Sequence, residues 1–148
     1  MLGTLAKWLR ILGYDTVYDP RLDDHGLVRL ARAEDRILLT RDRPLAGRRG
    51  LRALLIKSED LDEQLRQVLA ELELEPGRAF SRCPACNGLL EAIGQDEARA
   101  RVPAYVAGTH TNFKHCSSCS RVYWQGSHWQ QMEEHLSRLR APGTSQNT

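Results

Sequence analysis

The 148-residue sequence lacks any hydrophobic run near the roughly 18 residues that a membrane-spanning helix requires. Its N-terminal stretch, MLGTLAKWLRILGYD, also lacks the pattern of a secretory signal peptide, because Lys7 and Arg10 interrupt the apolar residues and no small-residue cleavage site follows. We expect both cations to be solvated on a helix surface. We therefore expect neither a signal peptide nor a membrane span, and a cytoplasmic location follows as the default.

A strong charge of one sign is also missing. The net charge of +2 is too small to indicate nucleic-acid binding by itself, and 41% hydrophobic with 27% charged residues is typical of a soluble globular protein. Locally the balance differs, since residues 41–52 carry Arg41, Arg43, Arg48, Arg49 and Arg52 against a single acid, Asp42. This segment could attract phosphate; the alternative is a solvated arginine-rich loop.

The first residues predict an amphipathic helix, because Leu2, Leu5, Leu9 and Leu12 recur at helical spacing, and Gly13 suits the C-terminal cap. The elements expected next are a strand at 16–18, a turn at 19–20, a helix capped by Asp23 or Asp24, strands at 37–40 and 53–56, and a helix after a capping box of Asp60 and Glu63.

Alternating helices and strands predict an α/β domain with a parallel sheet over residues 1–76. Pro76-Gly77 breaks the pattern, so we place a boundary there. Residues 80–132 are rich in Cys, Gly and turn residues and predict a separate small domain. Residues 133–148 predict a short helix followed by a disordered tail, APGTSQNT.

All four cysteines fall in two CxxC pairs, Cys83 with Cys86 and Cys116 with Cys119. Two such pairs complete a tetrahedral zinc site, and four thiolates leave no open position, so the predicted metal is structural. Disulfides are the first alternative, but nothing indicates export. A redox CxxC is the second, but it would not need two pairs. Because the segment has few apolar residues, the metal should supply much of its folding free energy.

Two carboxylates stand where an α/β sheet binds ligands. Asp24 begins a predicted helix, and Asp42 follows a predicted buried strand. Strand ends and helix starts meet at one edge of a parallel sheet, where two carboxylates could hold Mg²⁺ or Mn²⁺ for phosphodiester cleavage. The alternatives are that Asp24 is only a helix cap and that Asp42 only pairs with neighbouring arginines.

Aromatic residues gather after the second cysteine pair, at Tyr123, Trp124, His128 and Trp129. Exposed rings there could stack on unpaired RNA bases. The alternative is that they form the small core of the second domain. His110 and His115 lie close to Cys116, but we expect neither to bind metal because four thiolates already fill the site.

The chain resembles the Mut-seven C-terminal ribonuclease family over roughly residues 1–132. The resemblance is carried by the stretches LGTLAKWLRILGYDT, DDHGLVRLA, ILLTRD, SEDLDEQL, SRCPACNG, RVPAYV and RVYWQGSHW. It implies a PIN-like nuclease domain joined to a C-terminal zinc ribbon. By position, Asp24 and Asp42 match the family's acidic residues, Asp23 is an auxiliary, and the four cysteines match the zinc ligands.

The family usually begins with a strand that carries a metal-binding aspartate just before the stretch aligned with Met1. We expect that the true start site lies several codons upstream of Met1 and that the protein has not lost this strand. Loss of a central strand would leave unpaired backbone groups in its neighbours, and each such group costs about 1–3 kcal/mol. The resemblance thus implies an Mg²⁺- or Mn²⁺-dependent endoribonuclease with RNA as its partner. The alternatives are a non-catalytic nucleic-acid-binding module and a protein-interaction adaptor.

Overall fold

The computed structural model describes residues 2–72 and 79–140, with the side chains of Ser127, His128 and Arg140 outside the described part. The chain divides into two compact units. The first comprises Met1–Ala6 with Val17–Leu74, and the second comprises Lys7–Thr16 with Glu75–Thr148. The predicted boundary at Pro76-Gly77 and the tail APGTSQNT lie outside the described residues. The predicted domain ranges therefore stay a prediction.

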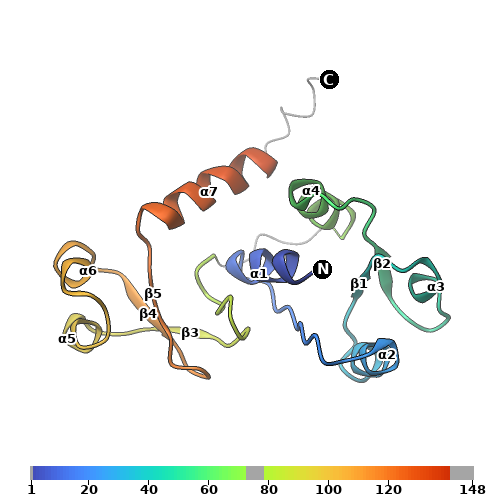
Figure 1. Ribbon diagram of the computed structural model, residues 1–148, viewed down its shortest axis with the longest axis horizontal. Helices are drawn as coiled ribbons and strands as arrows, with labels where there is room; N and C mark the ends of the chain where they lie inside the picture. The colour runs from blue at the N-terminus through green and yellow to red at the C-terminus, as the bar shows by residue number, and fades with distance from the viewer. Residues whose placement is uncertain (1, 73–78, 141–148) are drawn as a thin grey trace. The chain divides into compact units, whose positions relative to one another are not determined.

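Helix α1 (Gly3–Ile11) begins in the first unit and ends in the second (Figure 1). Its end is a Schellman motif: the Gly13 amide donates to the Arg10 carbonyl at 2.9 Å, and the Tyr14 amide donates to the Leu9 carbonyl at 3.0 Å. Gly13 adopts φ 99°, which glycine tolerates best. The predicted helix and its cap are confirmed.

The predicted strand at residues 16–18 is wrong, because this segment is irregular in the structure. Side chains form hydrogen bonds with the backbone groups that would otherwise pair with a neighbouring strand. The Thr16 amide donates to Asn87 Oδ1 at 3.0 Å, and the Thr16 carbonyl accepts from Arg10 Nε at 2.8 Å. The high strand propensity of Thr16, Val17 and Tyr18 was therefore a poor guide to the structure of this segment.

The first unit contains two parallel strands, β1 (Leu38–Thr40) and β2 (Ala53–Leu55), in a register that pairs Leu38 with Ala53 and Thr40 with Leu55. Three helices belong to the same unit: α2 (Asp24–Ala33), α3 (Arg43–Ala46) and α4 (Leu61–Glu71). Helix α3, which the sequence did not predict, contacts both strands (Figure 1). A small core joins α2, β1 and α3 through Val28, Ala31, Leu38 and Leu45.

The capping box predicted at α4 is present in a modified form. The Asp60 carboxylate accepts from the Glu63 amide at 3.1 Å, as predicted. The reciprocal bond is relayed, because Glu63 accepts from the Ser58 hydroxyl at 2.6 Å and that hydroxyl accepts from the Asp60 amide at 2.9 Å. The helix start is thus fixed by three side chains instead of two.

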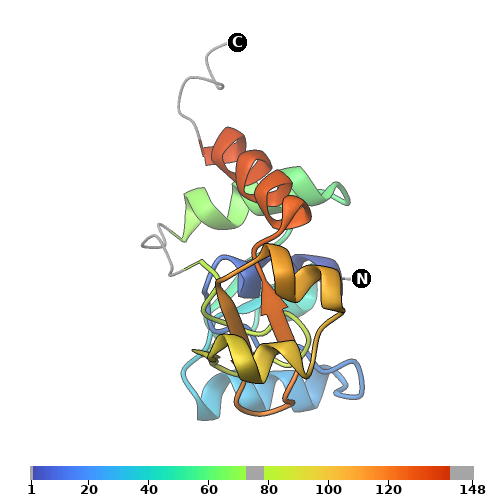
Figure 2. The same ribbon diagram turned by 90° about the vertical axis from the view of Figure 1, so that its left-hand side faces the viewer.

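The second unit contains an antiparallel sheet in the order β3 (Leu90–Ala92), β4 (Phe113–Cys116), β5 (Val122–Trp124). Two short helices, α5 (Gln95–Arg99) and α6 (Ala104–Thr109), lie between β3 and β4 in the chain, and Figure 2 turns them toward the viewer. Ala98, Val106 and Phe113 form their shared core. The predicted C-terminal helix is present as α7 (Ser127–Arg140).

These elements confirm a mixed α/β protein with one small parallel and one small antiparallel sheet. Two of the three strands predicted for residues 1–76 are present in the described part, and the PIN-like arrangement stays a prediction. Among the described helices, none has the length and apolar character needed to cross a bilayer.

Candidate functional site

The two cysteine pairs form turns with the same backbone pattern. In the first turn the Cys83 amide donates to the Gly88 carbonyl at 2.8 Å, and the Asn87 amide donates to the Cys83 carbonyl at 2.8 Å. In the second, the Cys116 amide donates to the Arg121 carbonyl at 2.8 Å, and the Ser120 amide donates to the Cys116 carbonyl at 2.9 Å. Each turn therefore presents its two thiols on one side, as a zinc knuckle does.

The four sulfur atoms come together. Cys83 Sγ lies 3.8 Å from Cys119 Sγ, and Cys86 Sγ lies 3.4 Å from Cys116 Sγ. All four lie within 4.8 Å of one another. A tetrahedron with Zn–S bonds near 2.3 Å has edges of about 3.8 Å, so these distances suit one zinc ion. The cysteines could hold zinc with no position left for a substrate.

Gly88 provides an independent test of the fit. A Cβ atom at this position would lie 2.8 Å from Cys116 Sγ and 2.9 Å from Ser118 Oγ. The backbone after the first knuckle thus passes directly beside a sulfur of the second, and only glycine leaves the necessary space. The chain is shaped around the sulfur cluster, as expected for a metal centre.

Hydrogen bonds tune the thiols unequally. Bonds from the backbone and guanidinium of Arg121 lower the pKa of Cys119 to about 6, against desolvation that opposes the shift. Desolvation of the thiol, with hydrogen bonds to the neighbouring thiols, raises the pKa of Cys86 to about 12, although the residue is exposed. The Tyr123 hydroxyl lies 3.0 Å from Cys83 Sγ, and burial raises the pKa of this phenol, so it remains protonated and can donate to a thiolate.

Arg10 contacts the first knuckle, and the sequence did not predict this contact. The prediction that Arg10 is solvated is wrong, since only 6% of the residue is exposed, whereas Lys7 is exposed as expected. Arg10 Nη1 donates to the Pro84 carbonyl at 2.9 Å. Its position four residues after the buried Ala6, on the same helix face, was the available signal.

The acidic candidates lie at helix starts in the first unit. Asp23 caps α2 by accepting from the Gly26 amide at 2.8 Å, and Asp24, the first residue of α2, is exposed. Asp42 is exposed at the end of β1 and caps α3 by accepting from the Leu45 amide at 3.0 Å. Within residues 2–72 and 79–140, the cysteines are the one group of three or more potential ligands found together.

The arginines of the 41–52 segment divide into two kinds. Arg41 turns back onto the strands: its Nη1 donates to the Ile56 carbonyl at 3.2 Å, and its Nη2 lies 3.9 Å from Glu59. Arg43, Arg48 and Arg49 are exposed. Arg43, Arg48 and Arg49 can therefore contact phosphate, whereas Arg41 links the ends of β1 and β2.

The aromatic side chains make internal contacts. Tyr123 is bound to Cys83 as described, and the Trp124 ring lies 6.4 Å from the Phe113 ring, centroid to centroid. The Trp129 ring lies 5.0 Å from that of Phe80. All three remain partly exposed, and the side chain of His128 lies outside the described part. Tyr105, at 74% exposure, is the most exposed large apolar residue described.

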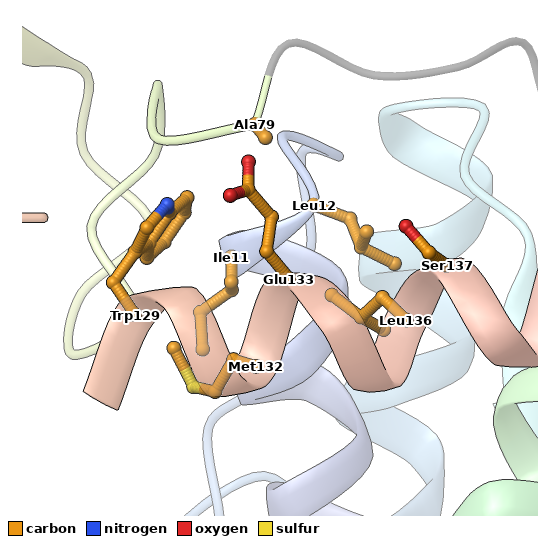
Figure 3. A pocket seen from close by; sticks show the side chains of 8 residues that line it. All are labelled: Ile11, Leu12, Ala79, Trp129, Met132, Glu133, Leu136 and Ser137. Carbon is orange, nitrogen blue, oxygen red and sulfur yellow. The ribbon is translucent and has the colours of Figure 1, made fainter. Parts of the chain in front are cut away.

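A hollow of about 200 Å³ lies beside Trp129 in the second unit. Figure 3 shows its wall, which is mainly apolar but includes the Glu133 carboxylate. The indole Nε1 of Trp129 is buried without a hydrogen-bond partner in the described structure. The lining comes from the end of α1, the segment before Phe80, and α7: Ile11, Leu12, Ala79, Trp129, Met132, Glu133, Leu136 and Ser137.

The two histidines near the second knuckle lie outside the sulfur cluster. His115 Nε2 lies 3.5 Å from Glu91 across the β3–β4 pair. His110 Nδ1 lies 2.9 Å from the Thr109 hydroxyl. Neither belongs to the group of potential metal ligands found in the described residues.

Comparison with known proteins adds one finding to this geometry. No curated protein and no solved structure matches the chain. A family model described as the Mut7-C RNAse domain matches residues 1–136, which include both cysteine pairs, Asp24 and Asp42. The chain therefore belongs to the Mut7-C RNAse domain family.

Proposed function

We propose that this protein is a metal-dependent endoribonuclease of the cytoplasm, with a PIN-like nuclease domain over residues 1–76 and a zinc ribbon over 80–132. The observation that carries the proposal is family membership, because the RNAse domain model spans residues 1–136. The exposed carboxylate of Asp42 at the end of β1, next to exposed arginines, supports it.

In this proposal Asp24 and Asp42 hold Mg²⁺ or Mn²⁺, with Asp23 as an auxiliary. Their donor set fits, since Mg²⁺ is commonly bound through one or two carboxylates and keeps several waters. A metal bound there would supply an activated water and stabilise the leaving oxygen. Asp23 and Asp42 are exposed residues, and each uses Oδ1 to cap a helix, which fixes the position of its carboxylate.

The zinc ribbon has a different role. Four thiolates leave no open coordination position, so zinc at Cys83, Cys86, Cys116 and Cys119 stabilises the fold and takes no part in cleavage. Arg43, Arg48 and Arg49 would contact the phosphate backbone, and Arg41 would hold the strand ends in place. The partly exposed faces of Tyr123, Trp124 and Trp129, together with His128, would contact bases.

The test is cleavage of a single-stranded RNA, with and without Mn²⁺, by purified protein that includes the upstream strand implied by the family resemblance. Asp24→Asn and Asp42→Asn should each reduce the rate by at least about 100-fold, since even outer-shell partners of a metal are worth about 10- to 100-fold. Asn preserves helix capping, so the unfolding free energy of Asp42→Asn should change by only a few tenths of a kcal/mol. Asp96→Asn, an exposed acid in the first turn of α5, is the control.

Full cleavage by both Asp24→Asn and Asp42→Asn would contradict the proposed site. The second candidate is a nucleic-acid-binding module without catalysis. It is favoured by one observation: the acidic candidates do not form a three-ligand group within the described residues. That reading predicts RNA binding that weakens with salt, needs no divalent metal, and is never followed by cleavage.

A further inference from the structure

Arg10 is a charged residue in a buried position. A guanidinium loses strong hydration when it is buried, and burial is tolerated only where hydrogen bonds and charge replace the water. Only 6% of Arg10 is exposed. Two of its hydrogen bonds end on neutral carbonyls, at Thr16 and Pro84, at 2.8 and 2.9 Å. Neutral carbonyls replace water only in part, so a nearby negative charge is expected.

The thiols of the first cysteine pair supply most of that charge: burial lowers the pKa of Arg10, and Cys83 and Cys86 oppose this effect, followed by the Asp15 carboxylate. Pro84 lies between Cys83 and Cys86, so the guanidinium is bonded to the backbone inside the first knuckle. A zinc ion with four thiolates carries a net charge of about −2. A fixed cation at this place offsets part of that charge in a poorly solvated environment, where the attraction is stronger than in water.

A second contact ties the same segment to the same knuckle. Asn87 Oδ1 accepts from the Thr16 amide at 3.0 Å, and Asn87 Nδ2 donates to Asp15 Oδ1 at 2.7 Å. Asn87 adopts φ 72° as part of the knuckle turn, so its side chain is aimed by the same backbone that presents the thiols. Together, Arg10 and Asn87 hold residues 10–16 against the first knuckle.

We propose that Arg10 is a positioning residue for the zinc site, which offsets the charge of the thiolate centre and couples zinc binding to the order of residues 10–16. The inference rests on the zinc ribbon of the proposed function and is independent of RNA cleavage. Coupling is reciprocal: if zinc stabilises the contacts of Arg10 with the knuckle, loss of those contacts weakens zinc by the same factor.

The first measurement is the zinc affinity of the full chain, by competition with a chromophoric chelator after metal analysis has established one bound zinc. Arg10→Gln should weaken zinc binding about 10- to 100-fold, the usual effect of an outer-shell partner. Lys7→Gln is the matched control, because it removes the same charge from an exposed position on the same helix, and its affinity should stay within about twofold of wild type. Equal affinities of the two variants would overturn the proposal.

The Arg10→Lys variant distinguishes the effect of the positive charge on zinc affinity from the effect of side-chain packing. Lysine keeps the cation but cannot reproduce the fork that reaches both carbonyls. It should therefore bind zinc more tightly than Arg10→Gln and less tightly than wild type. An affinity no better than that of Arg10→Gln would overturn the charge role.

Amide hydrogen exchange on the wild-type chain keeps the test valid if Arg10→Gln fails to fold. Removal of zinc should speed exchange at the amides of Tyr14 and Thr16, while α4 retains its protection. Unchanged exchange at 14–16, or an equal loss across α4, would contradict the coupling. A chain that binds no zinc at all would instead remove the zinc ribbon from the proposed function, so the two failures are distinguishable.

Discussion

Asn87 and Ser120 occupy equivalent positions, four residues after Cys83 and Cys116, and both adopt left-handed backbone conformations with φ 72° and 67°. Each closes its knuckle by donating its amide to the carbonyl of the first cysteine. Asparagine tolerates this conformation better than serine does. The two halves of the metal centre thus share one geometry but differ in how well their residues suit it.

Ser120→Gly should stabilise the zinc-loaded protein by about 0.5–1 kcal/mol, because glycine removes the left-handed strain and loses only part of the gain to greater freedom in the unfolded chain. Denaturant unfolding in the presence of excess zinc measures the effect. Ser118→Gly is the control, since Ser118 is not among the described residues with positive φ, and it should not stabilise. A less stable Ser120→Gly protein would contradict the strain argument.

Gly88→Ala should weaken zinc binding. The added Cβ would lie 2.8 Å from Cys116 Sγ, and forcing extra atoms into a packed site costs about 1–3 kcal/mol, or about 5- to 150-fold in affinity. Gly108→Ala is the control, because its Cβ meets nothing within 4 Å inside helix α6. Competition with a chelator measures both variants, and equal zinc affinities would show that Gly88 does not shape the site.

Where the second unit stays folded without zinc, Cys119 should react before Cys86. Its pKa of about 6 makes it mainly thiolate at pH 7, whereas Cys86, with a pKa raised to about 12, stays protonated. Alkylation by iodoacetamide, followed by mass spectrometry, should give a midpoint near pH 6 for Cys119. Arg121→Gln should move that midpoint toward 9, while Arg99→Gln, which removes an exposed arginine, should not.

The same shift fixes a dependence of stability on pH. Between about pH 6 and 9 the unfolded chain keeps a proton on Cys119 that the folded zinc-free chain has lost, so the unfolding free energy of that form rises with pH. Cys86 stays protonated in both states over most of this window and adds little. Faster alkylation of Cys86 than of Cys119 at pH 7 would contradict both expectations.

The arginines near Asp42 should differ in their effects on RNA binding and on the free energy of unfolding. Arg43→Gln, Arg48→Gln and Arg49→Gln should each weaken RNA binding and reduce the slope of log affinity against log salt by about 1, with unfolding free energy within about 0.5 kcal/mol of wild type. Arg41→Gln should instead cost about 1 kcal/mol of stability, because it loses the bond to the Ile56 carbonyl. Filter binding over a salt series tests RNA contact, and an unchanged slope in all three would exclude it.

Local rules with strong physical causes predicted much of the fold. The Gly13 cap, the Asp60 cap and the helix at 61–71 follow from short-range hydrogen bonds and apolar spacing, and all are present. The cysteine pairs come together as predicted because metal geometry restricts the spacing of ligands. Capping by Asp23 was predicted from residue type, whereas the cap that Asp42 provides for helix α3 was not.

Features that depend on distant residues could not be predicted. The predicted strand at 16–18 was wrong because Asn87 binds the Thr16 amide across 71 residues of sequence. Arg10 was expected in water because nothing local to it reveals the carbonyl of Pro84. The sheet of β3 to β5 combines strands of three or four residues, which are too short for alternation to identify.

The position of helix α1 limits how this protein can be divided into fragments. Because its first residues belong to the first unit and its last residues to the second, the second unit is discontinuous along the chain. A fragment that starts at Ala79 would keep all four cysteines yet lack Arg10 and the partner of Asn87 at Thr16. The second unit therefore cannot be excised as one continuous segment, and a single cut of the gene cannot yield both units intact.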